Sequence, residues 1–217
     1  MIAIVKYNAG NIGSVTNALN RLGVANIVTD DPAVLNTASK VIFPGVGEAG
    51  TAMSYLRERG LEHVLINLKQ PVLGICLGMQ LMCNHSEEGD TTCLGIFNTA
   101  VKRFPRPEVL EGQGLKVPHM GWNMLSSESR TTFENSGSPI SPKSAILTYI
   151  QSDSDVYYVH SYYAAICENT VAACDYIVPF SSVLQKDNFY ATQFHPEKSA
   201  SIGAQILKNF INISHEQ

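Results

Sequence analysis

Short apolar runs alternate with stretches of helical periodicity through residues 1–85. Strands are predicted where apolar runs are bounded by turn residues, at 2–5, 25–29, 41–43 and 72–75. Helices are predicted from the helical spacing of apolar positions, at 12–22, 32–37, 48–59 and 61–68. Asn11 can cap the first helix and Gly23 can end it. This alternation predicts a parallel sheet with right-handed helical crossovers.

The pattern changes near residue 94, where apolar runs become shorter and more typical of strands. Strands are predicted at 100–104, 116–118, 156–159, 170–176, 182–184 and 189–193. A last helix is predicted over about residues 199–213, and the Ser- and Pro-rich stretch 126–143 indicates a surface loop. We therefore expect one α/β domain over residues 1–217. Its open, mostly parallel sheet is flanked by helices, and a smaller antiparallel β portion follows in the second half.

A cysteine lies at the centre of the most informative stretch, residues 71–83. An apolar run ends in Gly74-Ile-Cys76-Leu-Gly78, and a helical pattern follows at once. A strand, a sharp turn and a helix with a cysteine at the turn resemble a nucleophile elbow. Glycines two residues before and after the cysteine leave room where strand and helix pack closely. The following helix presents its positive end to the sulfur, which favours a thiolate. A buried cysteine in an ordinary strand–helix turn is the alternative.

The predicted topology brings distant loops together. In open parallel sheets, ligands bind beyond the carboxyl ends of the strands. The segments that follow the first, third and fourth strands are Tyr7–Asn11, Pro44–Gly47 and the turn at Cys76. We therefore expect these segments to be neighbours at one edge of the sheet.

A second set of reactive side chains lies at the end of the last strand, in Gln193-Phe-His195-Pro-Glu197. A thiol nucleophile needs a base to accept its proton, and the base needs a group that holds its tautomer. Cys76, His195 and Glu197 supply these three residue types. A structural histidine and a carboxylate at a helix N-terminus are the alternatives for the latter two.

Composition narrows the function classes. Hydrophobic residues make up 45% of the chain and charged residues 16%, a balance that favours a filled core. The net charge of −4, without a basic block, argues against a nucleic-acid partner. No apolar run approaches the roughly 20 residues of a membrane span, and the start lacks signal-peptide features. Five cysteines form neither a disulfide framework nor a zinc motif, so we expect a cytoplasmic protein without metal or cofactor.

Taken together, the motifs resemble those of the class I glutamine amidotransferases. The segments that carry this resemblance are 74–80 and 194–199. Within the family, 44–47, 117–123 and 159–162 are most similar to the glutaminase subunits of imidazole glycerol phosphate synthases. The resemblance extends from the first strand to the last helix and implies a flavodoxin-like fold. It departs at Lys6, where the family pattern has aspartate.

The resemblance implies a role for each matched residue. Cys76 would attack the side-chain amide of L-glutamine and form a thioester. His195 would transfer the protons, and Glu197 would orient His195 and stabilise its cation. The Leu77 amide would be one oxyanion donor, and an amide of Val46 or Gly47 the other. Substrate contacts would come from Gly47, Gln80, Ser161 and Tyr162.

The resemblance also implies a partner. Asn11 and a loop containing Pro118, Met120 and Trp122 would contact a (β/α)₈-barrel cyclase in a heterodimer. Ammonia would pass through the barrel and yield imidazole glycerol phosphate and the aminoimidazole carboxamide ribotide, in histidine biosynthesis. Composition alone leaves Trp122 equally compatible with the core. His119 and His160 lie in matched motifs, but no acid–base role follows for them.

Two other functions stay open. A glutaminase subunit of another synthase, such as anthranilate synthase, would use the same chemistry with a different partner. A non-catalytic binding or redox-sensing module could retain the fold. A hydrolase with Ser, Asp and His in that order is excluded by residue type and by chain order.

Overall fold

The computed structural model describes residues 1–8, 10–105, 115–126 and 144–214. The surface loop predicted at 126–143 therefore lies outside the described residues, apart from Ser126. No helix in this described part of the chain has the length and apolar character to cross a membrane.

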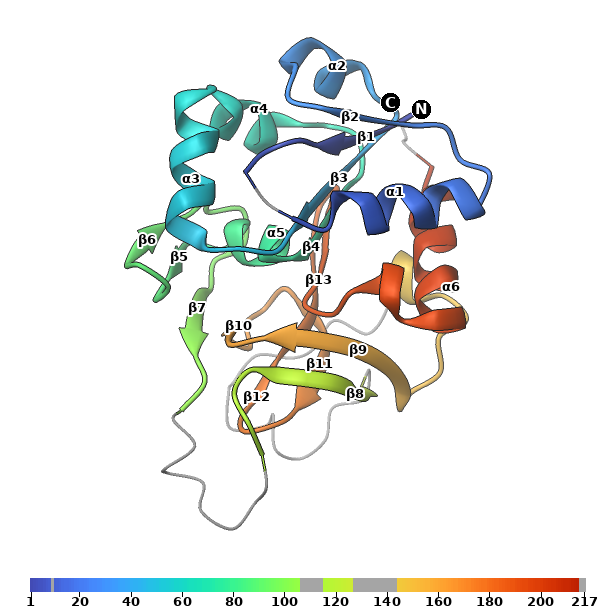
Figure 1. Ribbon diagram of the computed structural model, residues 1–217. Coiled ribbons are helices and arrows are strands. Elements are labelled where there is room, and N and C mark those ends of the chain that lie inside the picture. The colour runs from blue at the N-terminus through green and yellow to red at the C-terminus, as the bar shows by residue number, and fades with distance from the viewer. Residues whose placement is uncertain (9, 106–114, 127–143, 215–217) are drawn as a thin grey trace.

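A seven-stranded sheet forms the centre of the molecule (Figure 1), with strands in the order β11-β12-β13-β4-β3-β1-β2. The strands from β13 to β2 pair in parallel, whereas β12 pairs antiparallel with both β11 and β13. This confirms the predicted parallel sheet and adds its antiparallel edge. The strands are β1 (Ile2–Val5), β2 (Asn26–Thr29), β3 (Lys40–Gly45), β4 (Val72–Cys76), β11 (Thr170–Asp175), β12 (Pro179–Lys186) and β13 (Phe189–Thr192).

Helices cover both faces of this sheet (Figure 1), at the positions that the sequence predicts. One face is covered by α2 (Pro32–Thr37), α3 (Ala49–Glu58), α4 (Leu61–Asn67) and α5 (Leu77–Leu81). The other face is covered by α1 (Ile12–Arg21) and α6 (Ala200–Ile211). Gly23, at φ +71°, ends α1 as predicted, because the N–H of Val24 returns to the carbonyl of Leu19 at 3.0 Å.

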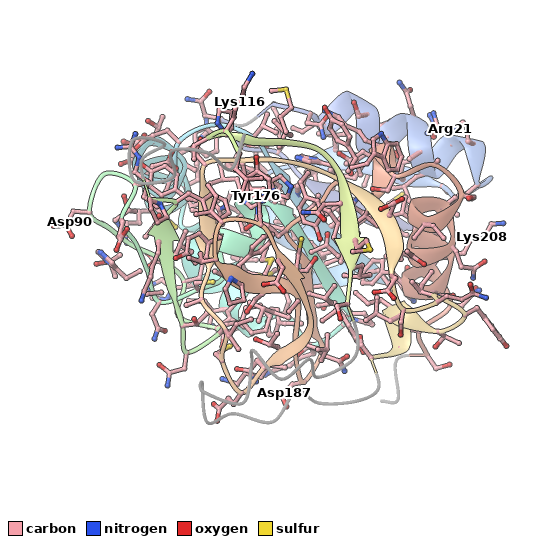
Figure 2. All side chains as sticks on the ribbon, turned by 90° about the horizontal axis from the view of Figure 1, so that it is seen from below. Arg21, Asp90, Lys116, Tyr176, Asp187 and Lys208 are labelled. Atoms are coloured by element: carbon pink, nitrogen blue, oxygen red, sulfur yellow. The ribbon has the colours of Figure 1, made fainter. Side chains whose placement is uncertain are left out.

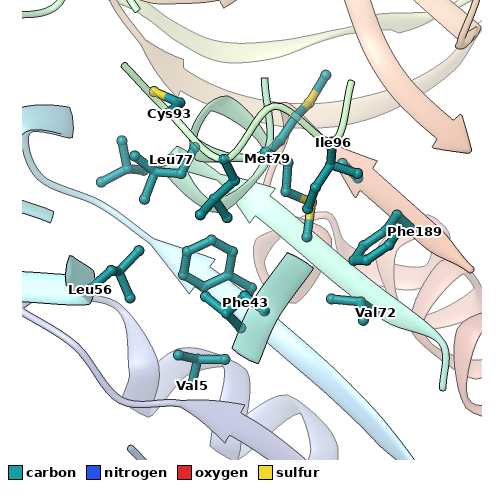
Figure 3. Close-up of a cluster of buried hydrophobic side chains, with 14 of the residues drawn as sticks. Val5, Phe43, Leu56, Val72, Leu77, Met79, Cys93, Ile96 and Phe189 are labelled. Carbon is teal, nitrogen blue, oxygen red and sulfur yellow. The ribbon is translucent and has the colours of Figure 1, made fainter. Parts of the chain in front are cut away.

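The two faces have separate hydrophobic clusters because strand residues alternate in direction. In β1, Ala3 and Val5 belong to one cluster, while Ile2 and Ile4 belong to the other. Figure 3 shows the first cluster gathered around the ring of Phe43. Burial on both faces explains why these strands are continuous apolar runs in the sequence.

Two smaller β units accompany the seven-stranded sheet. A four-stranded sheet contains β5 (His85–Ser86), β6 (Thr91–Thr92), β7 (Ala100–Arg103) and β10 (Tyr162–Ala164), in the order β10-β7-β5-β6. An antiparallel pair is formed by β8 (His119–Leu125) and β9 (Ser154–His160). Short 3₁₀ helices are η3 (Ala145–Leu147) and η4 (Pro196–Lys198). The smaller β portion is thus split into two units. The β8–β9 pair is antiparallel as expected, whereas the four-stranded sheet is mixed, because β5 pairs with β7 in parallel.

Strand β8 corrects two predictions. The strand expected at 116–118 is absent, and the segment expected as a loop from Pro118 to Asn123 is mostly strand. Pro118 has no N–H for a ladder, so pairing begins at His119. The alternation in β8 is also inverted, because Met120, Trp122 and Met124 are exposed while His119 is buried. A pattern with apolar side chains outward does not indicate a half-buried strand.

Candidate active site

Cys76 lies on a strained turn between β4 and α5. Its backbone has φ 53° and ψ −108°, a combination that non-glycine residues rarely adopt. A Cβ on Gly78 would lie 1.8 Å from the carbonyl oxygen of Phe43, and one on Gly74 would lie 3.0 Å from the Met79 nitrogen. The glycines are therefore required for close packing, as the sequence predicts. The turn holds the sulfur at the carboxyl end of the central strand.

His195 and Glu197 form a buried pair. His195 Nδ1 lies 2.7 Å from Glu197 Oε1, and both side chains are fully buried. Asn11 also donates from Nδ2 to Glu197 Oε1, and the same atom lies 3.3 Å from His195 Nδ1. The predicted capping role of the Asn11 side chain is wrong. At φ 70° it makes no cap hydrogen bond and contacts the pair instead.

The charge state of His195 is set by Cys76. Burial disfavours the imidazolium, but the negative charge of the Cys76 sulfur and the hydrogen bond to Glu197 outweigh it. Together they raise the pKa of His195 to about 10. His195 Nε2 forms no hydrogen bond within the described part of the chain. A protonated His195 is therefore favoured beside Cys76 and Glu197.

A pocket of about 260 Å³ opens beside Cys76. It is lined by all the residues predicted for the oxyanion and the substrate, namely Val46, Gly47, Leu77, Gln80, Ser161 and Tyr162. Four further lining residues are Glu88, Pro118, Val159 and His160. The segments that follow β1, β3 and β4 also meet, as predicted. Tyr7 Oη donates to the Pro44 carbonyl at 2.6 Å, and Gly45 pairs in register with Cys76.

Glu88 is a pocket residue that the sequence reasoning missed. It lies between β5 and β6, in a polar stretch without a motif, so only the tertiary structure brings it to the pocket. Its Oε2 accepts the Ala49 N–H at 2.9 Å. Burial and the nearby charge of Glu48 raise the pKa of Glu88, although the Ala49 hydrogen bond opposes this. A carboxylate here can bind an ammonium group.

Gln193 is a second missed residue, and it connects Gln80 to the nucleophile. Gln80 Nε2 donates to the Tyr162 carbonyl at 2.8 Å and to Gln193 Oε1 at 3.1 Å. Gln193 Nε2 in turn lies 3.7 Å from Cys76 Sγ. Gln193 is fully buried. Its position at the end of a predicted strand, two residues before His195, was the available signal.

The backbone around the nucleophile offers donors for an oxyanion. Leu77 follows Cys76 as the first residue of α5, where helix N–H groups have no intrahelical partner. The Val46 carbonyl accepts the Gly10 N–H at 3.1 Å. Because a trans peptide directs its N–H opposite to its carbonyl, the Gly47 N–H faces away from Gly10. Gly47 has φ 136°, a conformation that favours glycine.

An exposed apolar surface adjoins the pocket on the β8–β9 hairpin. Met120 is 63% exposed, Trp122 53% and Met124 44%. Trp122 therefore lies outside the core, and its ring packs edge-on against Tyr157 at 5.9 Å. The β9 residue Val159 joins this hairpin to the site, because its carbonyl lies 3.9 Å from Cys76 Sγ. Met124 was missed because the segment expected at the partner surface ended at Asn123.

Nothing in the described residues points to a metal centre. No cluster of three or more histidine, cysteine, aspartate or glutamate side chains has the arrangement of a metal site in this part of the chain.

Comparison with known proteins reveals close relatives over nearly the whole chain. The subunit HisH of imidazole glycerol phosphate synthase from Bacteroides thetaiotaomicron is 52% identical over 212 residues, covering 98% of this chain and 99% of its own length. The subunit of the same name from Bacteroides fragilis is 55% identical over 212 residues, with the same coverage. The one from Shewanella oneidensis is 42% identical over 222 residues, covering 98% and 96%.

Solved structures share the fold at lower identity. A glutamine amidotransferase crystal structure is 17% identical, with a TM-score of 0.68 and 97% of each chain covered. The structure of PurLQS from Thermotoga maritima is 16% identical, with a TM-score of 0.59 and the same coverage. The family model for class I glutamine amidotransferases matches residues 5–213. With this match and the pocket around Cys76, the chain belongs to the class I glutamine amidotransferase family.

Proposed function

We propose that the chain is the glutaminase subunit of an imidazole glycerol phosphate synthase. It hydrolyses L-glutamine to glutamate and ammonia, and a (β/α)₈-barrel cyclase in a heterodimer receives the ammonia. The cyclase makes imidazole glycerol phosphate and the aminoimidazole carboxamide ribotide, in histidine biosynthesis. The observation that carries the proposal is 52% and 55% identity, over 98% of the chain, to subunits of that name. We place the enzyme in the cytoplasm, which suits its free cysteines.

In this proposal Cys76 is the nucleophile and His195 the proton carrier. The sulfur bonds to the amide carbon of glutamine, and the C–N bond breaks as the His195 imidazolium gives its proton to the leaving nitrogen. Ammonia departs and a thioester remains. His195, now neutral, takes a proton from water, whose oxygen attacks the thioester and releases glutamate. Glu197 accepts the Nδ1–H throughout and stabilises each imidazolium.

The negative oxygen that forms in both steps needs two donors. The Leu77 N–H is adjacent to the nucleophile, and Val46 and Gly47, whose amides are the other candidates, line the same pocket. Each donor of this kind lowers the activation free energy by on the order of 3 kcal/mol. Gln80, Ser161 and Tyr162 then hold the rest of the substrate, and Glu88 offers a carboxylate for its ammonium group.

The exposed side chains of the hairpin support the proposal of a cyclase partner. Aromatic and methionine side chains are enriched at the centres of interfaces. Met120 and Trp122 present such side chains beside Pro118, and Pro118 also lines the glutamine pocket. A cyclase bound on this surface would lie next to the site of ammonia release. Asn11, whose backbone lies at the start of α1, remains a proposed contact with the cyclase.

Substitution of the nucleophile tests the chemistry. Cys76→Ala should lower glutamine hydrolysis by at least about 10⁴-fold, because the covalent route is lost. Cys167→Ala, a half-buried thiol away from the pocket, is the matched control and should retain activity. Equal activity of Cys76→Ala and the natural protein would rule out the thioester mechanism.

Co-expression with the barrel cyclase tests the partner. We expect a stable heterodimer, low hydrolysis by the isolated subunit, and a large increase when the cyclase and its ligand bind. Full activity of the isolated subunit would contradict the predicted activation. Assembly with a chorismate-using enzyme, rather than with the cyclase, would instead favour the anthranilate synthase alternative.

A further inference from the structure

A row of hydrogen bonds connects the exposed hairpin to the wall of the glutamine pocket. His119, at the start of β8, is paired in register with His160, at the end of β9. His119 Nδ1 lies 3.1 Å from His160 Nε2, and His160 Nδ1 lies 2.8 Å from the Tyr162 carbonyl oxygen. At the other end, Asn123 Nδ2 lies 3.4 Å from His119 Nε2.

The direction of every bond in this row follows from its inner end. The Tyr162 carbonyl can only accept, so His160 Nδ1 carries a hydrogen and the Nε2 of the neutral ring accepts. His119 Nδ1 must then donate, which leaves its Nε2 to accept from Asn123. The Asn123 amide is oriented by its other contacts, since its Oδ1 accepts the Met124 N–H and its Nδ2 also donates to the Asp175 carbonyl.

Both rings are held in place and kept neutral by their surroundings. His119 is stacked between Tyr176, at 3.8 Å, and Tyr158, at 4.8 Å between ring centroids. Tyr176 is labelled in Figure 2, near Lys116, whose N–H it accepts at 3.0 Å. Burial lowers the pKa of His119 to about 4 and that of His160 to about 3. A proton on either ring would place two N–H groups against each other and break the row.

The inner end reaches the nucleophile. The Tyr162 carbonyl accepts both from His160 Nδ1 and from Gln80 Nε2. Gln80 then contacts Gln193, which contacts the Cys76 sulfur. Gln80, His160 and Tyr162 also line the pocket directly. The position of one carbonyl therefore affects both the substrate-binding amide and the pocket wall.

We propose that His119 and His160 are positioning residues of the glutamine site. The pair acts as a directed relay that holds the Tyr162 carbonyl against Gln80, with Asn123 as its outer anchor. Asn123 lies between the exposed Trp122 and Met124, so the outer end of the relay is part of the proposed cyclase surface. This inference rests on the proposed glutaminase function. Neither ring contacts the reacting atoms as an acid or base, and both act through the Tyr162 carbonyl.

Kinetics of glutamine hydrolysis by the chain assembled with its cyclase test the relay. His160→Phe should raise KM about tenfold and change kcat less than about threefold, because one buried hydrogen bond that positions the binding amide is lost. His160→Asn keeps an N–H near the position of Nδ1 and should restore KM to within about threefold of the natural protein. His119→Phe should raise KM about fivefold, because His160 loses the donor that fixes its ring.

A double variant separates a relay from two independent structural roles. His119→Phe combined with His160→Phe should have the KM of His160→Phe alone, because the outer residue acts only through the inner one. Tyr176→Phe, which keeps the ring stacked on His119, is the matched control and should leave KM unchanged. Additive effects of the two histidine variants, or an unchanged KM in folded His160→Phe, would overturn the relay.

Nitrogen NMR of isotope-labelled histidine tests the relay without an activity assay. Both rings should be neutral at pH 7 and carry hydrogen on Nδ1. A hydrogen on Nε2 of either ring overturns the relay, whatever reaction the chain catalyses. Absence of glutamine hydrolysis in the natural complex would contradict the proposed function instead, so the two failures are distinguishable.

Discussion

The turn at Cys76 and the β8–β9 hairpin border the same pocket but are built in opposite ways. All five residues of β4 are buried, and the turn that follows depends on backbone atoms in close approach. The hairpin turns histidines and Tyr158 inward and presents Met120, Trp122 and Met124 to solvent. The Cys76 sulfur, the proposed nucleophile, therefore belongs to the rigid interior of the sheet. The wall that faces it belongs to a thin, polar unit with an uncovered apolar face.

This difference suggests separate roles for the two regions in catalysis and in partner binding. Close packing at Gly74 and Gly78 leaves the nucleophile little freedom to move. A hydrogen-bonded pair of buried histidines is sensitive to protonation and to whatever binds outside it. We infer that chemistry is fixed on the sheet side and that partner binding acts on the hairpin side. The following predictions, from the largest expected effect to the smallest, test this contrast.

Stability should depend on pH through the hairpin. The pKa values of His119 and His160 are lowered in the folded state, to about 4 and about 3. Below a pH of about 6.5 the unfolded state binds more protons, so stability falls as the pH decreases. At pH 5 the two rings together should cost up to about 4 kcal/mol relative to pH 7.5.

Urea denaturation at both pH values measures this loss. A double variant, His119→Asn with His160→Asn, lacks both titrating groups and should lose that part of the pH dependence. Equal pH dependence in the natural protein and the double variant would show that the rings are not neutral in the folded state.

Gly78→Ala should damage the sheet side. The added Cβ would meet the Phe43 carbonyl at 1.8 Å, and backbone atoms cannot move away without distorting β3. We expect a loss of about 3 kcal/mol in the free energy of unfolding. Gly13→Ala is the matched control, because nothing lies within 4 Å of its added Cβ in α1. It should stabilise the protein by up to about 1 kcal/mol, and similar results for both variants would refute the close-packing argument.

Trp122→Ala should weaken cyclase binding by about 2 kcal/mol, if the residue is an interface anchor. Because the side chain is 53% exposed, the free energy of unfolding should change by less than about 0.5 kcal/mol. Titration calorimetry with the cyclase measures the first effect and urea denaturation the second. Tyr149→Ala, at a residue 87% exposed, is the control and should not affect binding. Lower stability with unchanged binding would place Trp122 in the hairpin's own packing.

Glu88→Gln tests a part of the pocket wall that belongs neither to the Cys76 turn nor to the β8–β9 pair. Its carboxylate is the acidic group that lines the pocket, so its loss should raise KM for glutamine about tenfold. Steady-state kinetics of the assembled enzyme measure this effect, and kcat should change little. Glu58→Gln on the exposed end of α3 is the control. An unchanged KM in Glu88→Gln would exclude the proposed contact with the substrate ammonium.

The predictions of secondary structure were correct for strands buried on both faces and wrong for the strand whose apolar side chains face solvent. Strands β1, β3 and β4 are apolar runs buried on both faces, so local sequence identifies them without knowledge of their neighbours. Strand β8 presents Met120, Trp122 and Met124 outward, so it was expected to be a loop, and the strand predicted just before it, at 116–118, is absent. A strand that presents an apolar face to a partner cannot be recognised from a rule that apolar side chains point to the core.

The candidate site shows the same division. Cys76 and its glycines carry a local signal, because the turn itself requires them. His195 and Glu197 are recognised from a short motif in which they lie two residues apart. Glu88 carries no local signal, and Gln193 carries only its position at the end of a predicted strand, since each reaches its contacts through the packing of its element. The side chain of Asn11 was wrongly predicted for a similar reason. Its position before a helix predicts a cap, but its amide donates to Glu197, which is distant in the sequence.

The sequence by itself therefore determined the parallel sheet, the turn at Cys76, and the short motif that places His195 two residues before Glu197. These depend on residue type and on short spacings, which act within one element or one turn. Only the tertiary structure decided that Glu88 and Gln193 join the site, that Trp122 is exposed, and that His119 and His160 form one directed row. Such features depend on contacts between elements that are distant in the chain, and side-chain geometry across those contacts is not encoded in any local pattern.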